Sequence, residues 1–197
     1  MLTQREIIST IEMLKNEHLD VRAVTLGINL LDCASHIPEV FKKKIRDKIT
    51  GLARLLVPTC NEVGDKYGIP VVNKRISVSP IAVAAAPFSA DQMVSVAKTL
   101  NEIAREVNID FVGGFSALVE KGIARGDRAL IEAIPRALSE TDRVCASINV
   151  ASSKAGINMD AVLLMGQTIK QAAALSADRD GLACAKLCVF ANIPQDI

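Results

Sequence analysis

The chain has 197 residues, half of them apolar, and a formal net charge of +1 at neutral pH. This length suits one domain with a sizeable core, and interspersed charges of both signs give no reason to expect a nucleic-acid or membrane-surface partner. Polar residues precede any apolar run at the N-terminus, which is unlike a signal peptide, and no run of about 18 uncharged apolar residues predicts a membrane span.

Capping signals and helical spacing predict several helices. Thr3-x-x-Glu6 is a capping box before a helix with Ile7, Ile8, Ile11 and Leu14 on one face. A long helical region is expected from about residue 38 to 66, with breaks at Pro58 and Gly64. Further helices are expected to start at Ser89-x-x-Gln92, at Gly126-Asp127 with Pro135 as a candidate kink, and at Asn158.

Five apolar, strand-like runs alternate with these helices. They are Val21–Leu31, Pro70–Val78, Asp110–Leu118, Arg143–Val150 and Leu182–Ala191. Strands separated by helices of this length predict βαβ units and a parallel sheet.

Several of the predicted strands have one apolar face and one small, polar face. The polar faces carry Asn73, Arg75, Ser77 and Ser79, then Cys145, Ser147 and Asn149, then Cys184, Lys186 and Cys188. Central strands of a doubly wound sheet are apolar on both faces, so a sheet that curves around a polar interior fits better. Five strands cannot close an eight-stranded barrel, and the pattern therefore favours half of a larger barrel. An ordinary open α/β sheet with a few edge strands is the alternative.

Five blocks of sequence carry a family resemblance. They are Val24–Ile28 with Leu31–Cys33, Gly68–Val78, Phe111–Leu118, Lys154–Val162 and Cys184–Leu187. In this order they resemble uncharacterised protein family 0210, also called domain of unknown function 711 and often labelled "PFL-like". The resemblance runs over essentially the whole chain.

The resemblance implies a ten-stranded α/β barrel similar to that of pyruvate formate-lyase, a glycyl-radical enzyme, built from two five-stranded parallel halves. It also implies a cytoplasmic homodimer without an established activity, and a protein about twice this length. We therefore expect residues 1–197 to form a single α/β domain, the N-terminal half-barrel of a longer protein. The label "PFL-like" implies no radical chemistry, because the sequence shows no radical-bearing glycine loop.

Candidate binding residues lie on the polar strand faces and in one loop. Arg75 can bind a carboxylate or phosphate with two hydrogen bonds, and Asn73 can orient a ligand; an internal ion pair is the alternative. Ser153 and Lys154 follow a strand and precede a helix, beside Ser147 and Asn149, and a capped solvent loop is the alternative there. Lys186 must find either an anion or a structural partner inside the sheet.

Other residues give weaker signals. Gly113-Gly114 lacks the spacing of a phosphate loop and favours tight packing or a bulge. The five cysteines include no Cys-x-x-Cys pair and predict reduced thiols, and the two histidines lack the spacing of metal ligands. Asp32 is expected to raise the pKa of Cys33. The sequence thus assigns no metal, cofactor or catalytic residue.

Three functional hypotheses remain open at this stage. The first is an enzyme that binds or transforms a small anionic metabolite in a polar barrel interior, through Asn73, Arg75, Ser147, Asn149, Ser153, Lys154 and Lys186. The second is a non-catalytic ligand-binding or regulatory protein. The third is an inactive, truncated half-barrel.

Overall fold

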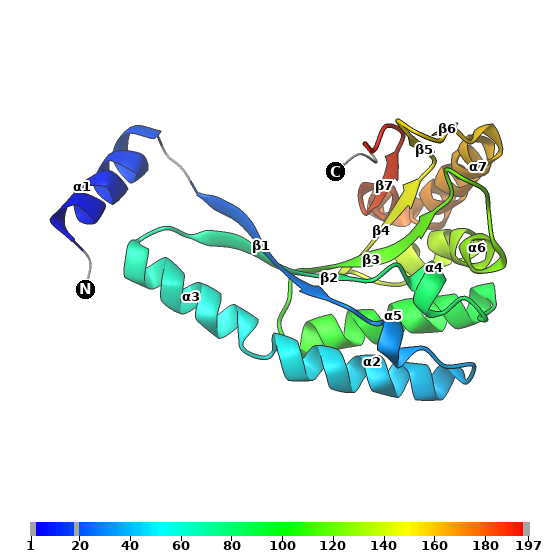
Figure 1. Ribbon diagram of the computed structural model, residues 1–197, viewed down its shortest axis with the longest axis horizontal. Coiled ribbons are helices and arrows are strands. Elements are labelled where there is room, and N and C mark those ends of the chain that lie inside the picture. Colours follow the sequence, from blue (N-terminus) through cyan, green and yellow to red (C-terminus); the bar gives the residue numbers. More distant parts are fainter. Residues whose placement is uncertain (1–2, 18–19, 195–197) are drawn as a thin grey trace.

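The computed structural model describes residues 3–17 and 20–194 (Figure 1). Its elements run from α1 (Gln4–Glu12) and η1 (Met13–Glu17) through β1 (Val21–Ile28), η2 (Leu31–Cys33), α2 (Pro38–Ala53), α3 (Leu56–Tyr67), β2 (Val71–Val78), α4 (Ile81–Ala84), α5 (Ala90–Glu106), β3 (Phe111–Leu118), α6 (Arg125–Ser139), β4 (Val144–Asn149), β5 (Ala151–Ser152), β6 (Gly156–Ile157), α7 (Met159–Leu175), η3 (Ala177–Arg179) and α8 (Leu182–Ala185) to β7 (Leu187–Phe190).

A parallel sheet organises the described residues. Its five strands lie in the order β1-β2-β3-β4-β7, so each βα unit places its strand beside the preceding one. The short strands β5 and β6 pair with each other separately. The predicted five-stranded parallel α/β sheet is confirmed.

Helices cover one face of this sheet. Figure 1 shows α2, α3 and α5 beneath β1–β3, with α6 and α7 continuing the layer around β4 and β7. Successive helices of the layer pack on one another, α2 on α5, α5 on α6 and α6 on α7. The strand residues that face this layer, including Ile28, Ile76, Val112, Val144 and Ile148, belong to one buried core. Burial of this apolar surface is the main stabilising contribution.

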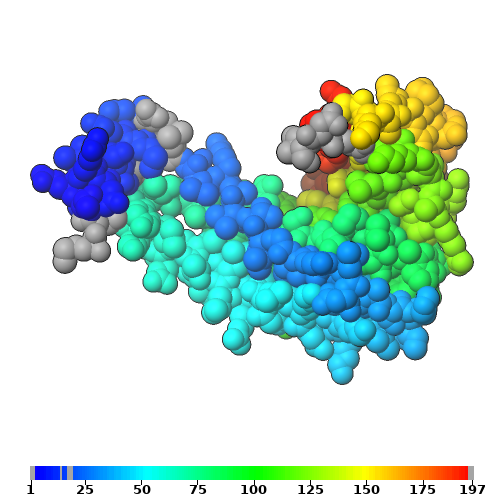
Figure 2. Space-filling model, in the orientation of Figure 1, coloured from blue at the N-terminus to red at the C-terminus, as the bar shows by residue number. Residues whose placement is uncertain are grey.

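The opposite face of the sheet is polar and largely uncovered in the part of the chain that the structure describes. Thr25, Arg75, Ser77 and Cys188 on this open face are exposed, and Ser147 is half-buried. The space-filling view shows the molecule hollowed above the middle strands, between the N-terminal helix and the end formed by β7 and α7 (Figure 2). The alternation of apolar and polar residues along the strands produces this difference between the faces.

A bulge in β3 keeps its two faces distinct. Val112 pairs with Val144, but the next paired residue is Phe115, opposite Ala146. The extra residue lies at Gly113-Gly114, where Gly114 has a φ of 104°. A Cβ atom on Gly114 would lie 2.3 Å from the Val78 carbonyl oxygen. The predicted bulge is therefore present, and only glycine fits at Gly114.

Two predicted boundaries are wrong. The helical region breaks between α2 and α3, before Pro58, because Pro58 lies in the first turn of α3, where its missing N–H costs nothing. The break predicted at Gly64 is absent, because α3 continues through that residue. The last predicted strand, Leu182–Ala191, begins as the helical turn α8, and only Leu187–Phe190 pairs with β4. The turn forms because Asp180 and Gly181, both at positive φ, reverse the chain there.

Several local predictions are confirmed. Thr3 with Glu6 and Ser89 with Gln92 form capping boxes, and Asn158 caps α7. Pro135 lies inside α6. His18 and the side chain of Leu14 lie outside what the structure describes.

Substituting the two glycines of the bulge should separate their roles. Gly114→Ala should lower the free energy of unfolding by about 2 kcal/mol or more, because positive φ costs about 1–2 kcal/mol and the added methyl meets backbone. Gly113→Ala should cost about 1 kcal/mol or less, because its Cβ would make contacts no closer than 3.9 Å. Urea denaturation measures both values, and equal losses would contradict the assignment.

Candidate functional site

The open face of the sheet contains a hollow over its middle strands. It has a volume of about 420 Å³ and is lined by Thr25, Arg75, Ile76, Ser77, Phe111, Gly113, Cys145, Ala185 and Lys186. An adjoining hollow of about 250 Å³ shares Gly113, Cys145, Ala185 and Lys186 and adds Ser147 and Cys188. We call the two together the open-face hollow. It brings three predicted site residues together, Arg75, Ser147 and Lys186.

Arg75 is the cation of this hollow with free hydrogen-bonding capacity. Its guanidinium carbon lies 5.5 Å from the centroid of the Phe111 ring, a cation–π arrangement. Among the described residues it forms no salt bridge with an acid. The five N–H groups of a guanidinium can therefore still bind a planar anion.

Lys186, in contrast, uses its ammonium group in hydrogen bonds to the backbone. The residue lies directly after α8 and not in a strand, and it is only 8% exposed. Its ammonium donates hydrogen bonds to the carbonyl oxygens of Leu138, at 2.7 Å, in the last turn of α6, and of Thr141, two residues after the end of that helix. These carbonyls have no partner within the helix, and a cation at this position also complements the helix dipole. Burial lowers the pKa of the Lys186 ammonium. Of the two partners expected for Lys186, an anion or a structural group, the structure therefore provides structural ones, two backbone carbonyls.

The thiol of Cys145 lies in the same hollow but is poorly suited to attack a substrate. Burial raises its pKa, and the nearby cations Lys186 and Arg75 only partly oppose that effect. Burial is also the largest cause of the raised pKa of Cys33, followed by the predicted effect of Asp32. Both thiols stay protonated at neutral pH, and a protonated thiol is a weak nucleophile.

The other predicted site residues lie elsewhere. Asn73 donates a hydrogen bond from Nδ2 to the Arg22 carbonyl oxygen at 3.1 Å and does not line the hollow. Asn149 is buried at the carboxyl end of β4, where its Nδ2 donates to Glu120 Oε2 at 3.1 Å. Ser153 and Lys154 are exposed between β5 and β6, and the Ser153 N–H donates to the Ile193 carbonyl. The structure therefore divides the predicted set between the open face and the strand ends.

A second region, at the carboxyl ends of β3 and β4, contains a separate hollow of about 790 Å³. We call it the strand-end hollow. Its walls are the connections that follow β3 and β4, and it is lined by Glu120, Lys121, Gly122, Ile123, Arg128, Ala155, Asn158 and Asp160. Sequence reasoning missed Glu120, because only the folded chain brings its carboxylate to Asn149.

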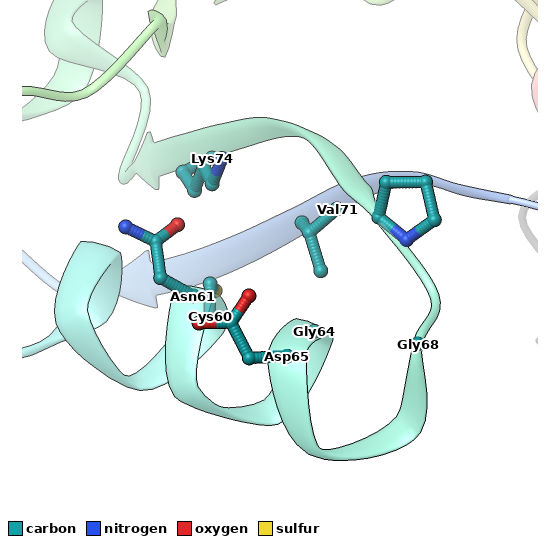
Figure 3. A pocket seen from close by; sticks show the side chains of 8 residues that line it. Cys60, Asn61, Gly64, Asp65, Gly68, Val71 and Lys74 are labelled. Atoms are coloured by element: carbon teal, nitrogen blue, oxygen red, sulfur yellow. The ribbon is translucent and has the colours of Figure 1, made fainter.

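A third hollow, of about 650 Å³, lies between α3 and β2 (Figure 3). Cys60, Asn61 and Asp65 of α3 lie opposite Val71 and Lys74 of β2. Lys74 thus faces a different space from Arg75, as the strand alternation predicts.

Two kinds of site receive no support from the described residues. No group of three or more His, Cys, Asp or Glu side chains in residues 3–17 and 20–194 is placed to hold a metal ion. Within the same residues, no helix is long and apolar enough to cross a membrane.

The molecule is thus an α/β protein with a one-sided helix layer and a polar open sheet face. A family model described as "Uncharacterised ACR (DUF711)" matches residues 12–197, and the chain belongs to that family. This confirms the predicted family resemblance.

The chain is similar to proteins described as "UPF0210 protein". It is 66% identical over all 197 residues to one from Syntrophobacter fumaroxidans and to one from Desulfovibrio desulfuricans, and covers 43% of each. It is 56% identical over 194 residues, 98% of the chain, to one from Methanosarcina acetivorans and covers 42% of it. The chain therefore spans less than half the length of these curated relatives.

The structural role of Lys186 predicts that its replacement destabilises the fold. Lys186→Met keeps most of the side-chain volume but leaves the carbonyls of Leu138 and Thr141 without their donor. We expect a loss of about 1–3 kcal/mol in the free energy of unfolding, the usual cost of unsatisfied buried groups. Thermal or urea denaturation measures it, and unchanged stability would contradict the assigned role.

The raised pKa of Cys145 predicts slow alkylation of its thiol at neutral pH. Iodoacetamide should modify the exposed Cys188 well before Cys145 at pH 7. Labelling of Cys145 should accelerate above pH 9, because a raised pKa moves thiolate formation to alkaline pH. Mass spectrometry of peptides over a pH series measures both rates, and labelling of Cys145 ahead of Cys188 at pH 7 would contradict the prediction.

Proposed function

We propose that the open-face hollow binds a small anionic metabolite and that Arg75 is its principal ligand. The observation that supports this most directly is the set of contacts around the Arg75 guanidinium. Its guanidinium carbon lies 5.5 Å from the centroid of the Phe111 ring, and the residue borders a hollow of about 420 Å³ and has no acidic partner among the described residues. A cation–π contact uses the charge of the guanidinium and not its N–H groups, so these groups can still bind a carboxylate or phosphate.

The surroundings of Arg75 suit a small ligand. Thr25 and Ser77 supply hydroxyl groups from the adjacent strands β1 and β2, and Gly113 leaves room where a side chain would project. Ser147 and Lys186 border the adjoining part of the hollow. Asn73, Asn149, Ser153 and Lys154 stay outside this proposal, because none of them lines the hollow.

We further propose that the open face is the interior of a PFL-like barrel and that the chain supplies one five-stranded half of it. The one-sided helix layer and the polar inner face support this arrangement. In it, a second set of strands would cover the face and the edges β1 and β7, by association with another copy of the chain or with further protein. Light scattering over a dilution series tests association, and a stable monomer at all concentrations would count against a homodimer.

Binding without catalysis is the second candidate function, and the lining of the hollow favours it. Among its described lining residues, the titratable groups are Arg75, Cys145, Lys186 and Cys188. The first three are poorly placed as a general base, because a guanidinium has no acceptor, the Cys145 thiol stays protonated at neutral pH and the Lys186 ammonium donates to two backbone carbonyls. Saturable binding without turnover of the bound metabolite would favour a sensor or regulatory protein over an enzyme.

Arg75→Ala tests the anion site. We expect at least a tenfold loss of affinity for inorganic phosphate or malonate by calorimetric titration, equivalent to about 1.4 kcal/mol. Stability should fall by only about 0.5–1 kcal/mol, the contribution of an exposed cation–π contact. A large loss of stability with unchanged anion affinity would make Arg75 structural and overturn the proposal.

The matched control for this experiment is Arg22→Ala. Arg22 is an exposed arginine of the neighbouring strand β1 that pairs with Asp20 and does not line the hollow. It removes the same charge, so equal losses of anion affinity in the two variants would indicate a nonspecific charge effect and not a site.

A further inference from the structure

The helix layer ends at α7, and one flank of that helix is apolar and uncovered. In the layer, α2 packs on α5, α5 on α6 and α6 on α7, and within the described residues no further helix follows β7. Figure 1 shows α7 and β7 together at this end of the molecule. We propose that this flank of α7 binds an amphipathic helix from the remainder of the longer protein, which takes the next position in the layer. The proposal rests neither on the anion site nor on closure of the barrel.

Two stripes of residues run side by side along α7, and only one of them is covered. The buried stripe consists of Ala161, Met165, Thr168 and Ala172. The residue that follows each of these in the sequence belongs to the second stripe, which we call the α7 flank and which consists of Val162, Gly166, Ile169 and Ala173. Val162 and Ile169 are 39% and 40% exposed, although burial of such side chains is favourable.

The other side of the buried stripe is polar. It carries Asp160, Gln167 and Gln171, which are all exposed and suit contact with water. A helix that faced solvent on both sides of its buried stripe would be polar on both. The apolar character of one side only therefore indicates an interaction surface.

Contacts with α8 show on which side of α7 the flank lies. The Cys184 thiol donates to the Ile169 carbonyl oxygen at 3.6 Å, so α8 lies beside the flank. Leu182 of α8 is 48% exposed and adds to the apolar surface there. The helix α8 leads directly into β7, which pairs with β4 alone among the described strands. The flank thus lies toward the free edge of the sheet.

The core side of β7 is also incompletely covered. Leu187 and Val189 pair in register with Ala146 and Ile148 of β4 and share their side of the sheet. Ala146 and Ile148 are buried, whereas Leu187 and Val189 are only half-buried. A crossover helix after a parallel strand packs back on the same side of the sheet as the preceding helices, because such connections are right-handed. A helix after β7 would therefore cover both this side of β7 and the α7 flank.

Gly166 suits the α7 flank to another helix. Glycine in a helix interior is destabilising relative to alanine. A Cβ atom at Gly166 would have no atom of a neighbouring element within 4 Å, so no contact among the described residues requires glycine there. A docked helix does benefit from it, because two backbones approach closely where a side chain is absent. Lys170 is exposed beside the flank and forms no salt bridge with a described residue, so we expect an acidic residue at the edge of the docked helix.

Length and position identify the occupant as a helix of the same protein. The chain covers 43% of the relative from Syntrophobacter fumaroxidans, so more than half of that protein has no counterpart in residues 1–197. Each of β1, β2, β3 and β4 is followed by a helix of the layer, and β7 is the strand of this sheet that lacks one in residues 3–17 and 20–194. A helix of the longer protein can follow β7 through a short connection, which a second copy of the chain does not offer.

The experiment supplies the missing part as a separate polypeptide. The part of the Syntrophobacter fumaroxidans relative outside the matched stretch is produced together with the chain, and sedimentation velocity measures their association. Ile169→Cys and Gln171→Cys place labelling probes on the flank and on the polar side of the same helix. We expect the added polypeptide to slow iodoacetamide labelling at residue 169 at least tenfold and to leave labelling at residue 171 unchanged, as measured by mass spectrometry of peptides.

Charge variants test whether the contact stabilises the complex. Ile169→Glu should weaken association at least tenfold, because docking would bury the new carboxylate. The matched control Gln171→Glu adds the same charge on the polar side of α7 and should leave association unchanged. Both residues are exposed in the chain alone, so both variants should fold, which thermal melting of the isolated chain checks. Gly166→Leu should also weaken association, because its side chain would separate the two helices, while the open space around Gly166 lets the chain fold.

Three results would overturn the proposal. One is the absence of association when the two polypeptides are produced together. Another is an equal effect of the two glutamate variants, or equal protection of the two introduced thiols. The third is protection of residue 169 in the chain alone as its concentration rises, which would make the flank an interface between two copies.

The exposed thiol of Cys188 separates this proposal from the barrel proposal, because it lies on the open face of the sheet. Protection of Cys188 by the added polypeptide without protection at residue 169 would support a covered open face and overturn docking at α7. Protection at residue 169 without protection of Cys188 would support docking at α7 and count against the barrel.

Discussion

The fold depends on the burial of only one face of its parallel sheet. Because side chains alternate along a strand, the position of a residue in that alternation decides whether it joins the core with Ile76 and Ile148 or faces the open side with Arg75 and Ser147. The β3 bulge preserves this division. Its extra residue returns Phe115 to the core side, and without it the remainder of β3 would present its apolar residues to the open face.

The same division determines what the two cations of the open face can do. Lys186 is buried, and its ammonium donates to carbonyl oxygens at the end of α6. It therefore stabilises the position of that helix more than it attracts a ligand. Arg75 remains exposed and contacts a ring instead of an acid. Arg75 and Lys186 were both predicted from the sequence as candidate anion ligands, but they differ in role. The reason is that tertiary structure determines the partner of a buried charge.

Periodicity in the sequence predicted the five strands, their parallel arrangement, the capped helices and the polar face. It failed at Leu182–Ala191, because a short run of alanines and cysteines satisfies both strand alternation and one helical turn. It also placed Asn149 with Arg75, since alternation gives the face of a residue but not its surroundings. Asn149, at the end of β4, instead bonds Glu120, a residue of the loop after β3, and only the folded chain brings these two side chains together.

The barrel proposal and the anion proposal support each other energetically. An ion pair at 4 Å contributes about 1 kcal/mol in bulk water and about 4 kcal/mol at the effective dielectric of a protein surface region. Arg75 on an uncovered sheet lies nearer the first value, and salt screens it further. If other strands covered the open face, they would exclude water from the hollow and move the same contact toward the second value. Anion affinity at Arg75 should therefore increase with closure of the face, and a chain that binds weakly alone would bind more tightly once covered.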